Sequence, residues 1–229
     1  MSDKFTWLEG IPVLTKCLSP KFLTGEWRDF VFREDDVLIL AFPKSGTHWM
    51  MEILSLIRTK GDPKWIQSVP IWDRSPWLEA KNLYEALEAQ EGPRLISSHL
   101  PIQLLPKSLF TSKTKSHQLH CKYILRGSCK EMDTRSTIEK ICQFLGKTLE
   151  PEELNSVLKH SSFQAMRENK MSNYTLADGV FVNLKNGSFL RKGISGDWRN
   201  HLTVAQAEAF DRAFQEKMAG LPPELFPWE

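Results

Sequence analysis

A short loop near residue 45 combines a lysine, a glycine and two hydroxyl side chains, a set suited to binding a phosphate. Residues 43–47 read Pro-Lys-Ser-Gly-Thr. Small residues between a strand and a helix let backbone N–H groups converge on a phosphate at the positive helix end, and Lys44 would add a charge. A Walker A loop places its lysine elsewhere, after the second glycine. The loop predicts an anion site, with an ordinary strand-to-helix turn as the alternative.

A second basic segment with two glycines lies late in the chain. Arg191 offers a planar guanidinium to a phosphate, and Lys192 offers a flexible ammonium. Gly193 and Gly196 allow a ligand to approach the backbone closely. Considered alone, this segment is better explained as a solvated basic loop. Together with the first loop, it predicts two anion sites.

His99 is the candidate for proton transfer. It ends a second strand candidate, residues 94–99, and the proline at 101 disfavours any continuation of that strand. An unperturbed imidazole titrates near neutral pH, which suits a general base. The alternative is a buried structural histidine.

These residues require a strand, a tight loop and a helix to position them. Residues 37–42 form a continuous apolar run, typical of a buried strand in a parallel sheet. Beyond the loop, apolar residues recur at helical spacing from 50 to 57, and the helix should end near residue 60. The first half of the chain therefore predicts strand, loop and helix.

Other segments carry weaker signals. Residues 65–77 hold three tryptophans and two prolines, and they predict an irregular aromatic loop that could line a pocket. Ser136 with Glu139 has the spacing of a capping box at the start of a helix. Thr203 with Gln206 predicts the cap of another helix. The buried stripe of this last helix should consist of Ala207, Phe210, Phe214 and Met218.

Length and charge limit the class of protein. The 229 residues suffice for one domain with its own core, and the formal net charge of +2 is too small for a nucleic-acid binder. No apolar run approaches the roughly 18 residues of a membrane span, and the N-terminus lacks the apolar stretch of a signal peptide. The four cysteines are scattered, as in compartments where thiols stay reduced. We expect a cytoplasmic protein without a membrane or nucleic-acid partner.

Three motifs together resemble one family. Trp49 follows the loop at 43–47, residues 97–101 read Ser-Ser-His-Leu-Pro, and residues 191–198 read Arg-Lys-Gly-Ile-Ser-Gly-Asp-Trp. In this combination the chain resembles the cytosolic sulfotransferases, and most closely their hydroxysteroid branch, which acts on bile salts and alcohols. The match covers nearly the whole chain. It implies an α/β fold in a single domain, 1–229, with a parallel sheet flanked by helices and a P-loop-like phosphosulfate-binding loop.

The resemblance also implies an activity. A sulfuryl group would pass from 3'-phosphoadenosine 5'-phosphosulfate to a hydroxyl or amine of a lipophilic acceptor such as a steroid or bile salt. His99 would take the acceptor proton and Lys44 would stabilise the leaving phosphate oxygen, with no metal. His48 stands where the family more often has asparagine or threonine. The implied nucleotide-binding residues are Lys44, Ser45, Gly46, Thr47, His48, Trp49, Ser161, Ser162, Phe163, Gln164, Ala165, Met166, Arg191, Lys192 and Gly193.

Two further features follow from the resemblance. Trp72 and Trp77 would join His99 in a largely apolar acceptor pocket, although tryptophans that only close the core explain them equally well. Leu18 stands where similar enzymes more often carry an aromatic side chain. The segment from Arg199 to Glu208 resembles the family's dimerisation motif, which implies a homodimer, but a capped helix start explains it without a partner.

The chain departs from the family between about 115 and 137. Roughly fifty to sixty residues of strand, motif and helices are absent there on this comparison. The absent part would supply an arginine and a serine to the 3'-phosphate. Arg126 and Ser128 are the candidates to replace them in part, but residues 127–130 do not match the family's motif. A truncated, impaired relative that only binds nucleotide or dimerises is therefore the alternative.

Two other interpretations are disfavoured. The position of the lysine and the lack of an aspartate for magnesium argue against a kinase-like P-loop enzyme. A zinc site does not follow the usual spacing of paired ligands. Its candidates would be His117, His120, Cys121 and Cys129.

Overall fold

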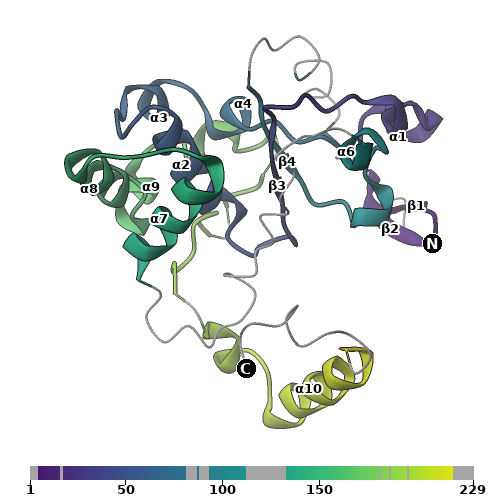
Figure 1. Cartoon of the computed structure of the whole chain (residues 1–229). Coiled ribbons are helices and arrows are strands. Elements are labelled where there is room, and N and C mark those ends of the chain that lie inside the picture. The colour runs from purple at the N-terminus through teal and green to yellow at the C-terminus, as the bar shows by residue number, and fades with distance from the viewer. Residues whose placement is uncertain are drawn as a thin grey trace.

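A parallel pair of strands forms the centre of the computed structural model, which describes residues 5–15, 18–80, 87, 93–111, 133–180, 182–185, 187–194 and 196–218. Strand β3 (Val37–Leu40) pairs with β4 (Leu95–Ser98), with Val37 opposite Leu95 and Leu40 opposite Ser98. Helices from both halves of the chain lie beside this pair (Figure 1). The predicted α/β class with a parallel sheet is confirmed.

The two faces of the strand pair belong to different cores. Ile39 and Leu95 face a cluster that includes helix α2 (Thr47–Arg58), whereas Leu38 and Ile96 face a second cluster. This alternation follows from the two-residue period of strand side chains. Strands buried on both faces are apolar throughout, as predicted for residues 37–42, but the strand ends at Leu40 and Phe42 is 70% exposed.

The first core lies among the helices on one side of the strands in Figure 1. Helix α2 is buried along most of its length, and residues 50–57 are all in the interior. Its neighbours in this core come from both halves of the chain. They are α3 (Lys64–Ser68), α4 (Ile71–Arg74), α7 (Thr134–Leu145), α8 (Pro151–His160) and α9 (Phe163–Glu168).

The second core lies on the opposite side of the strands, among N-terminal elements (Figure 1). There Phe22 and Trp27 stack with ring centroids 4.9 Å apart, and Leu18 is buried beside them. The elements on this side are the antiparallel hairpin β1 (Phe5–Leu8) and β2 (Ile11–Leu14), α1 (Pro20–Thr24), η2 (Glu26–Asp29), η3 (Ile102–Leu104) and α6 (Ser108–Thr111).

Three local predictions need correction. Residues 65–77 are not wholly irregular, because α3 and α4 form within them. Helix α7 begins three residues earlier than expected, since the Asp133 carboxylate accepts hydrogen bonds from Arg135 N and Ser136 N. An aspartate cap binds the first free N–H groups as well as the serine would.

The third correction concerns helix α10 (Val204–Met218), which lies apart from the other helices (Figure 1). Its predicted cap is confirmed, because Gln206 N donates to Thr203 Oγ1 and Thr203 N donates to Gln206 Oε1. The predicted buried stripe is wrong: Phe210 is 66% exposed, and Ala207 and Phe214 are only partly buried. The apolar pattern identified the helix and its apolar face correctly, but a pattern does not supply the surface that would cover that face.

Some predictions fall outside the described residues. These concern Arg126, Ser128, the histidines and cysteines between 117 and 129, and Cys17. Within the described ranges, no helix is long and apolar enough to span a membrane.

Candidate functional site

The loop after β3 is bent so that it opens the N-terminus of α2. Lys44 and Gly46 both adopt positive φ, at 65° and 95°. The Ser45 hydroxyl stabilises the turn by donating a hydrogen bond to Phe42 O at 2.6 Å. Gly46 is the residue before the first helical turn, where no side chain caps the helix. The free N–H groups of this turn and the helix dipole favour an anion at this position.

Thr47 carries the clearest sign of a ligand site. Its side chain is 2% exposed, and its Oγ1 has no hydrogen-bond partner. Within the described residues only Arg74 Nη1 shares that condition. Buried polar atoms in native proteins are nearly always hydrogen-bonded. A phosphate oxygen at the helix N-terminus would satisfy the Thr47 hydroxyl.

The predicted stretch at 161–166 joins the loop through Trp49. Trp49 Nε1 donates to Ser161 O at 2.9 Å, and Ser162 caps α9 by accepting from Ala165 N at 3.2 Å. Two members of the stretch lie away from the loop in other roles: Met166 is buried in the first core, and Gln164 hydrogen-bonds Glu168.

Gly193 lies directly against Phe163. A Cβ at Gly193 would come within 2.3 Å of the Phe163 ring, and the φ of Gly193 is 65°. Only glycine fits both the left-handed backbone and this close approach. The late basic segment is thereby packed against the start of α9.

Arg191 and Lys192 are not free cations in this structure. Both contact the carboxylate of Asp197, with Lys192 Nζ at 2.7 Å, and Asn200 Nδ2 and His201 Nε2 donate to it as well at 2.9 and 3.1 Å. The hydrogen bond from Lys192, followed by those from Asn200 and Arg191, holds the pKa of Asp197 well below its usual range. An internal carboxylate therefore occupies the donors expected to bind the 3'-phosphate.

The Lys44 ammonium lies over the ring of Phe189. Its Nζ lies 4.2 Å from the centroid of Phe189, a cation–π contact. Burial and the nearby charge of Arg191 lower the pKa of Lys44. The two predicted anion segments are therefore close enough to interact electrostatically.

His99 is held in one orientation at the end of β4. Its Nδ1 lies 2.5 Å from Ala41 O, and its backbone N donates to Glu79 Oε1 at 2.7 Å. Because a carbonyl only accepts hydrogen bonds, the neutral ring carries its proton on Nδ1 and leaves Nε2 able to accept a proton. Burial lowers the pKa of His99, which keeps the imidazole neutral at physiological pH.

An aromatic cluster joins His99 to the loop. Trp77 lies against His99 with centroids 4.3 Å apart, and Trp72 contacts Tyr174 at 5.1 Å. His48 Nε2 lies 2.8 Å from Tyr174 Oη. Burial, helped by the charges of Lys44 and His99, lowers the pKa of His48 to about 3, so this ring is neutral. Both tryptophans are partly buried at the edge of the first core, so they can cover the core and line a site together.

Sequence reasoning missed four members of the site, which are Tyr174, Phe189, Glu79 and Asp197. Tyr174 stacks on Phe189 with centroids 4.2 Å apart, and Tyr174 adopts a φ of 65°. Asp197 had a detectable signal, since it lies within the late basic motif, but no periodicity or motif marked the remaining three.

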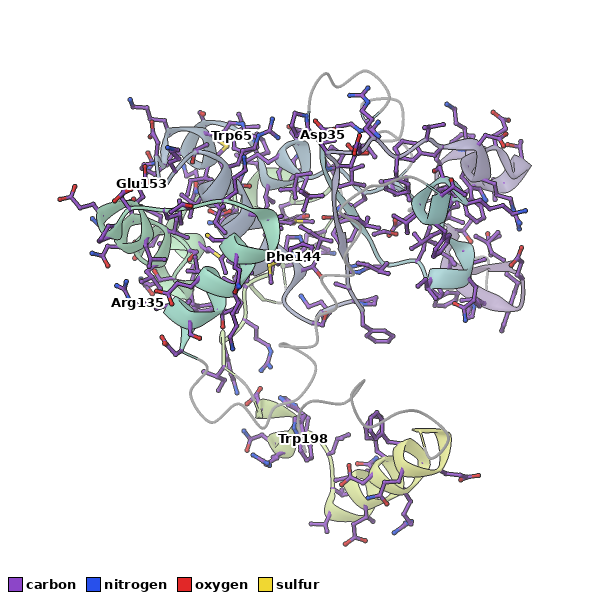
Figure 2. All side chains as sticks on the ribbon, in the orientation of Figure 1. Asp35, Trp65, Arg135, Phe144, Glu153 and Trp198 are labelled. Carbon is purple, nitrogen blue, oxygen red and sulfur yellow. The ribbon has the colours of Figure 1, made fainter. Side chains whose placement is uncertain are left out.

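The segment predicted to mediate dimerisation lies in the C-terminal part of the chain. Arg199 packs over Trp198 at 5.1 Å, within η6 (Asp197–Asn200), and Figure 2 shows Trp198 in the part of the chain that carries α10. Val204 is 76% exposed.

Among the described residues, no group of three His, Cys, Asp or Glu side chains could hold a metal ion.

Comparisons with known proteins agree with this geometry. A family model described as "Sulfotransferase domain" matches residues 34–120 and 123–222. Sulfotransferase 2A1 of Macaca fascicularis is 50% identical over 286 aligned positions that cover 100% of both chains. Mouse sulfotransferase SULT7A1 complexed with PAP shares the fold, with 21% identity, a TM-score of 0.69 and 95% of each chain covered. A retinol dehydratase in complex with androsterone and inactive cofactor PAP gives 16% identity and a TM-score of 0.73, covering 93% of this chain and 88% of that one.

The alignment with the Macaca fascicularis relative also shows a difference in length. It spans 286 positions while this chain has 229 residues, so 286 minus 229 leaves 57 positions that the chain does not fill. The family match is interrupted between residues 120 and 123, inside the interval where the sequence lacked the expected strand and helices.

Proposed function

The chain belongs to the sulfotransferase family, and we propose that its site transfers a sulfuryl group from 3'-phosphoadenosine 5'-phosphosulfate to a hydroxyl or amine of a small lipophilic acceptor. The observation that carries this proposal is the buried, unpartnered Thr47 hydroxyl at the N-terminus of α2. Relatives named as sulfotransferases across the full chain do not favour the alternative of a protein that only binds nucleotide or dimerises.

The loop residues fit the phosphosulfate end of the nucleotide. The N–H groups at the start of α2 and the hydroxyl of Thr47 would bind its oxygens, and the positive φ of Gly46 supports that close approach. The nucleotide supplies an activated sulfuryl group on a phosphate that can leave. Lys44 would stabilise negative charge on the leaving oxygen, because a preplaced cation binds the transition state more tightly than the ground state.

His99 would accept the acceptor proton at Nε2. Its hydrogen bond to Ala41 O fixes the tautomer in which this nitrogen carries the lone pair. Its lowered pKa keeps that lone pair available at neutral pH. Ala41 is also three residues before Lys44, so the end of β3 supports both the base and the cation.

The acceptor is proposed to be a steroid or a bile salt. The partly buried rings of Trp72 and Trp77 support an apolar acceptor wall beside His99. A structural relative in complex with androsterone is consistent with such a ligand.

The exposed start of α10 supports a homodimer through the segment Arg199 to Glu208. The family resemblance supports a single cytoplasmic domain.

Calorimetric titration with 3'-phosphoadenosine 5'-phosphate tests the proposal. Thr47→Val keeps the shape of the side chain and removes only the hydroxyl, so it should weaken binding about tenfold or more, as for a lost hydrogen bond to a charged group. Thr59→Val is the matched control, because Thr59 Oγ1 donates to carbonyls at the other end of α2. Failure of the unmodified chain to bind, or equal affinity in both variants, would contradict the proposal.

A further inference from the structure

We propose that Glu79 is a positioning residue for the acceptor base, because its carboxylate fixes the backbone of His99. This inference rests on the function proposed above. Glu79 is 6% exposed. Its Oε1 accepts the His99 N–H at 2.7 Å and its Oε2 accepts the Ser98 hydroxyl at 2.9 Å. One carboxylate thus binds two successive residues where β4 ends.

The carboxylate of Glu79 stabilises the turn that follows the end of β4. Ser98 Oγ also accepts from Leu100 N at 3.1 Å, so Glu79 and Ser98 together satisfy the polar groups of the turn after β4. The His99 ring then has two restraints of different origin: its N–H is held by Glu79, and its Nδ1 is held by Ala41 O. Two restraints on either side of Cα leave little freedom in where Nε2 points.

The segment that carries Glu79 also carries the aromatic partner of His99. Leu78 N donates to Ser97 O and Ser97 N donates to Pro76 O, both at 2.9 Å, so this segment runs alongside β4. Glu79 lies in the turn that Ala80 N closes by donating to Trp77 O at 3.0 Å, and both Trp77 and Glu79 contact His99, one at the ring and the other at the backbone N–H. The acceptor wall and the support of the base are therefore a single unit.

Glu79 differs from the other buried carboxylates among the described residues. Glu52 pairs with Arg74 at 2.8 Å and Asp36 with Arg94 at 2.5 Å, whereas no Lys or Arg within the described ranges forms an ion pair with Glu79. A buried carboxylate without a cation is costly, and an amide side chain could accept from His99 N without burying a charge. The carboxylate at this position therefore fits a role in the site better than a role in stability.

The protonation state of Glu79 decides whether it can perform this role. Burial raises the pKa of Glu79 to about 7, while hydrogen bonds from His99 N and Ser98 oppose the rise. The ionised carboxylate accepts from both donors most strongly, because protonation turns one of its oxygens into a donor, so the support should weaken as the pH falls through about 7. The titratable groups near it are His99 and, beyond Trp77, His48 and Lys44; burial lowers the pKa of all three.

The first test observes His99 directly and needs no turnover. Imidazole nitrogen NMR should report the Nδ1-protonated tautomer in the unmodified chain at pH 8, and a mixture of tautomers in Glu79→Ala. Glu79→Gln should give a result between these two, because its amide oxygen can accept from His99 N but its amide nitrogen cannot accept from Ser98 Oγ. An unchanged tautomer in Glu79→Ala would overturn the proposal.

The second test measures turnover against pH. Glu79→Gln should lower kcat at pH 8 about tenfold, leave 3'-phosphoadenosine 5'-phosphate affinity unchanged, and move the acid limb of the pH profile from near 7 to below 6.5, where His99 alone titrates. Ser75→Ala is the control, since it removes the buried 2.7 Å contact to Ser97 without touching His99. An acid limb that stays near 7 in Glu79→Gln would refute the role. Absence of turnover in the unmodified chain would count against the proposed function, and the NMR result would still decide on Glu79.

Discussion

The two segments expected to bind the ends of the nucleotide differ in how their polar groups are satisfied before a ligand arrives. In the loop before α2, Thr47 Oγ1 is buried without a partner and Lys44 lies on the ring of Phe189. In the late segment, Arg191 and Lys192 already contact a carboxylate, that of Asp197, whose side chain is 3% exposed. The first segment offers an unpaired donor, whereas the second already contains an anion of its own.

The difference teaches that basic residues in a motif do not by themselves make a free anion site. The loop is anchored by a strand and a mostly buried helix, so its groups are fixed before binding. The late segment carries half-exposed cations whose charge Asp197 partly cancels, so a 3'-phosphate must share or displace that carboxylate. We therefore expect the loop to contribute most of the affinity and all of the charge stabilisation at the reacting end.

The largest expected effect is that of Lys44→Ala on turnover. Removing a preplaced charge-stabilising group typically costs about 100- to 1,000-fold in rate. Nucleotide affinity should fall much less, because charge on the leaving oxygen grows in the transition state. Single-turnover transfer and calorimetry measure the two effects separately, and added chelator is the control that should change neither. Equal losses in rate and affinity would mean that Lys44 only binds the ground state.

Restoring the 57 absent positions should give the next largest effect. A version of this chain with the middle segment of the 50% identical relative inserted between residues 120 and 123 should bind 3'-phosphoadenosine 5'-phosphate at least about 30-fold more tightly. That is the loss expected for one missing partner of a buried phosphate contact, roughly 2 kcal/mol. The inserted version should also melt at a higher temperature. Equal affinity and equal melting would show that the short chain rebuilds the site by itself.

Gly193→Ala should lower nucleotide affinity about tenfold and reduce stability by roughly 1–2 kcal/mol through its left-handed backbone alone. The added Cβ would push Phe163 and with it the start of α9. Gly179→Ala is the matched control, because Gly179 has a φ of 79° and no atom lies within 4 Å of the position that its Cβ would take. Thermal melting should fall in both variants, and affinity in Gly193→Ala alone. Unchanged affinity there would separate the late segment from the nucleotide site.

Asp197→Asn should have the smallest effect, and its sign matters more than its size. Releasing two half-exposed cations should raise nucleotide affinity about two- to fivefold, the range of partly exposed ion pairs. Calorimetry at low and high salt measures the gain, which should shrink as salt screens the cations. A loss of affinity would instead make Asp197 the organiser of Arg191 and Lys192.

The elements that hold the loop could be predicted from the sequence because they rest on local rules. The apolar run that begins at residue 37, the glycine at 46 and the helical spacing after it together favour a strand, a tight loop and a helix in that order. His99 followed from a strand that stops before a proline. Trp49 and Ser161, 112 positions apart, were brought together only by the resemblance, and their hydrogen bond agrees with it.

The remaining residues depend on contacts that no local pattern encodes. Glu79 and Phe189 reach the site from segments without helical or strand periodicity, and the positive φ of Tyr174 is set by its surroundings. The pairing of Arg191 with Asp197 was within reach, because both lie in one motif, but the motif does not say which anion its cations bind. The exposed Phe210 shows the same limit for packing, since an apolar pattern does not specify which surface will cover it.

The asymmetry between the two segments is tested most directly by comparing two nucleotides that differ only in the 3'-phosphate. Calorimetric titration of the unmodified chain with adenosine 5'-phosphate and with 3'-phosphoadenosine 5'-phosphate isolates the contribution of the late segment. We predict that both bind and that the 3'-phosphate adds less than about tenfold, because its cations are already paired with Asp197. A gain of about 100-fold or more from the 3'-phosphate, or no binding of either nucleotide, would contradict this account.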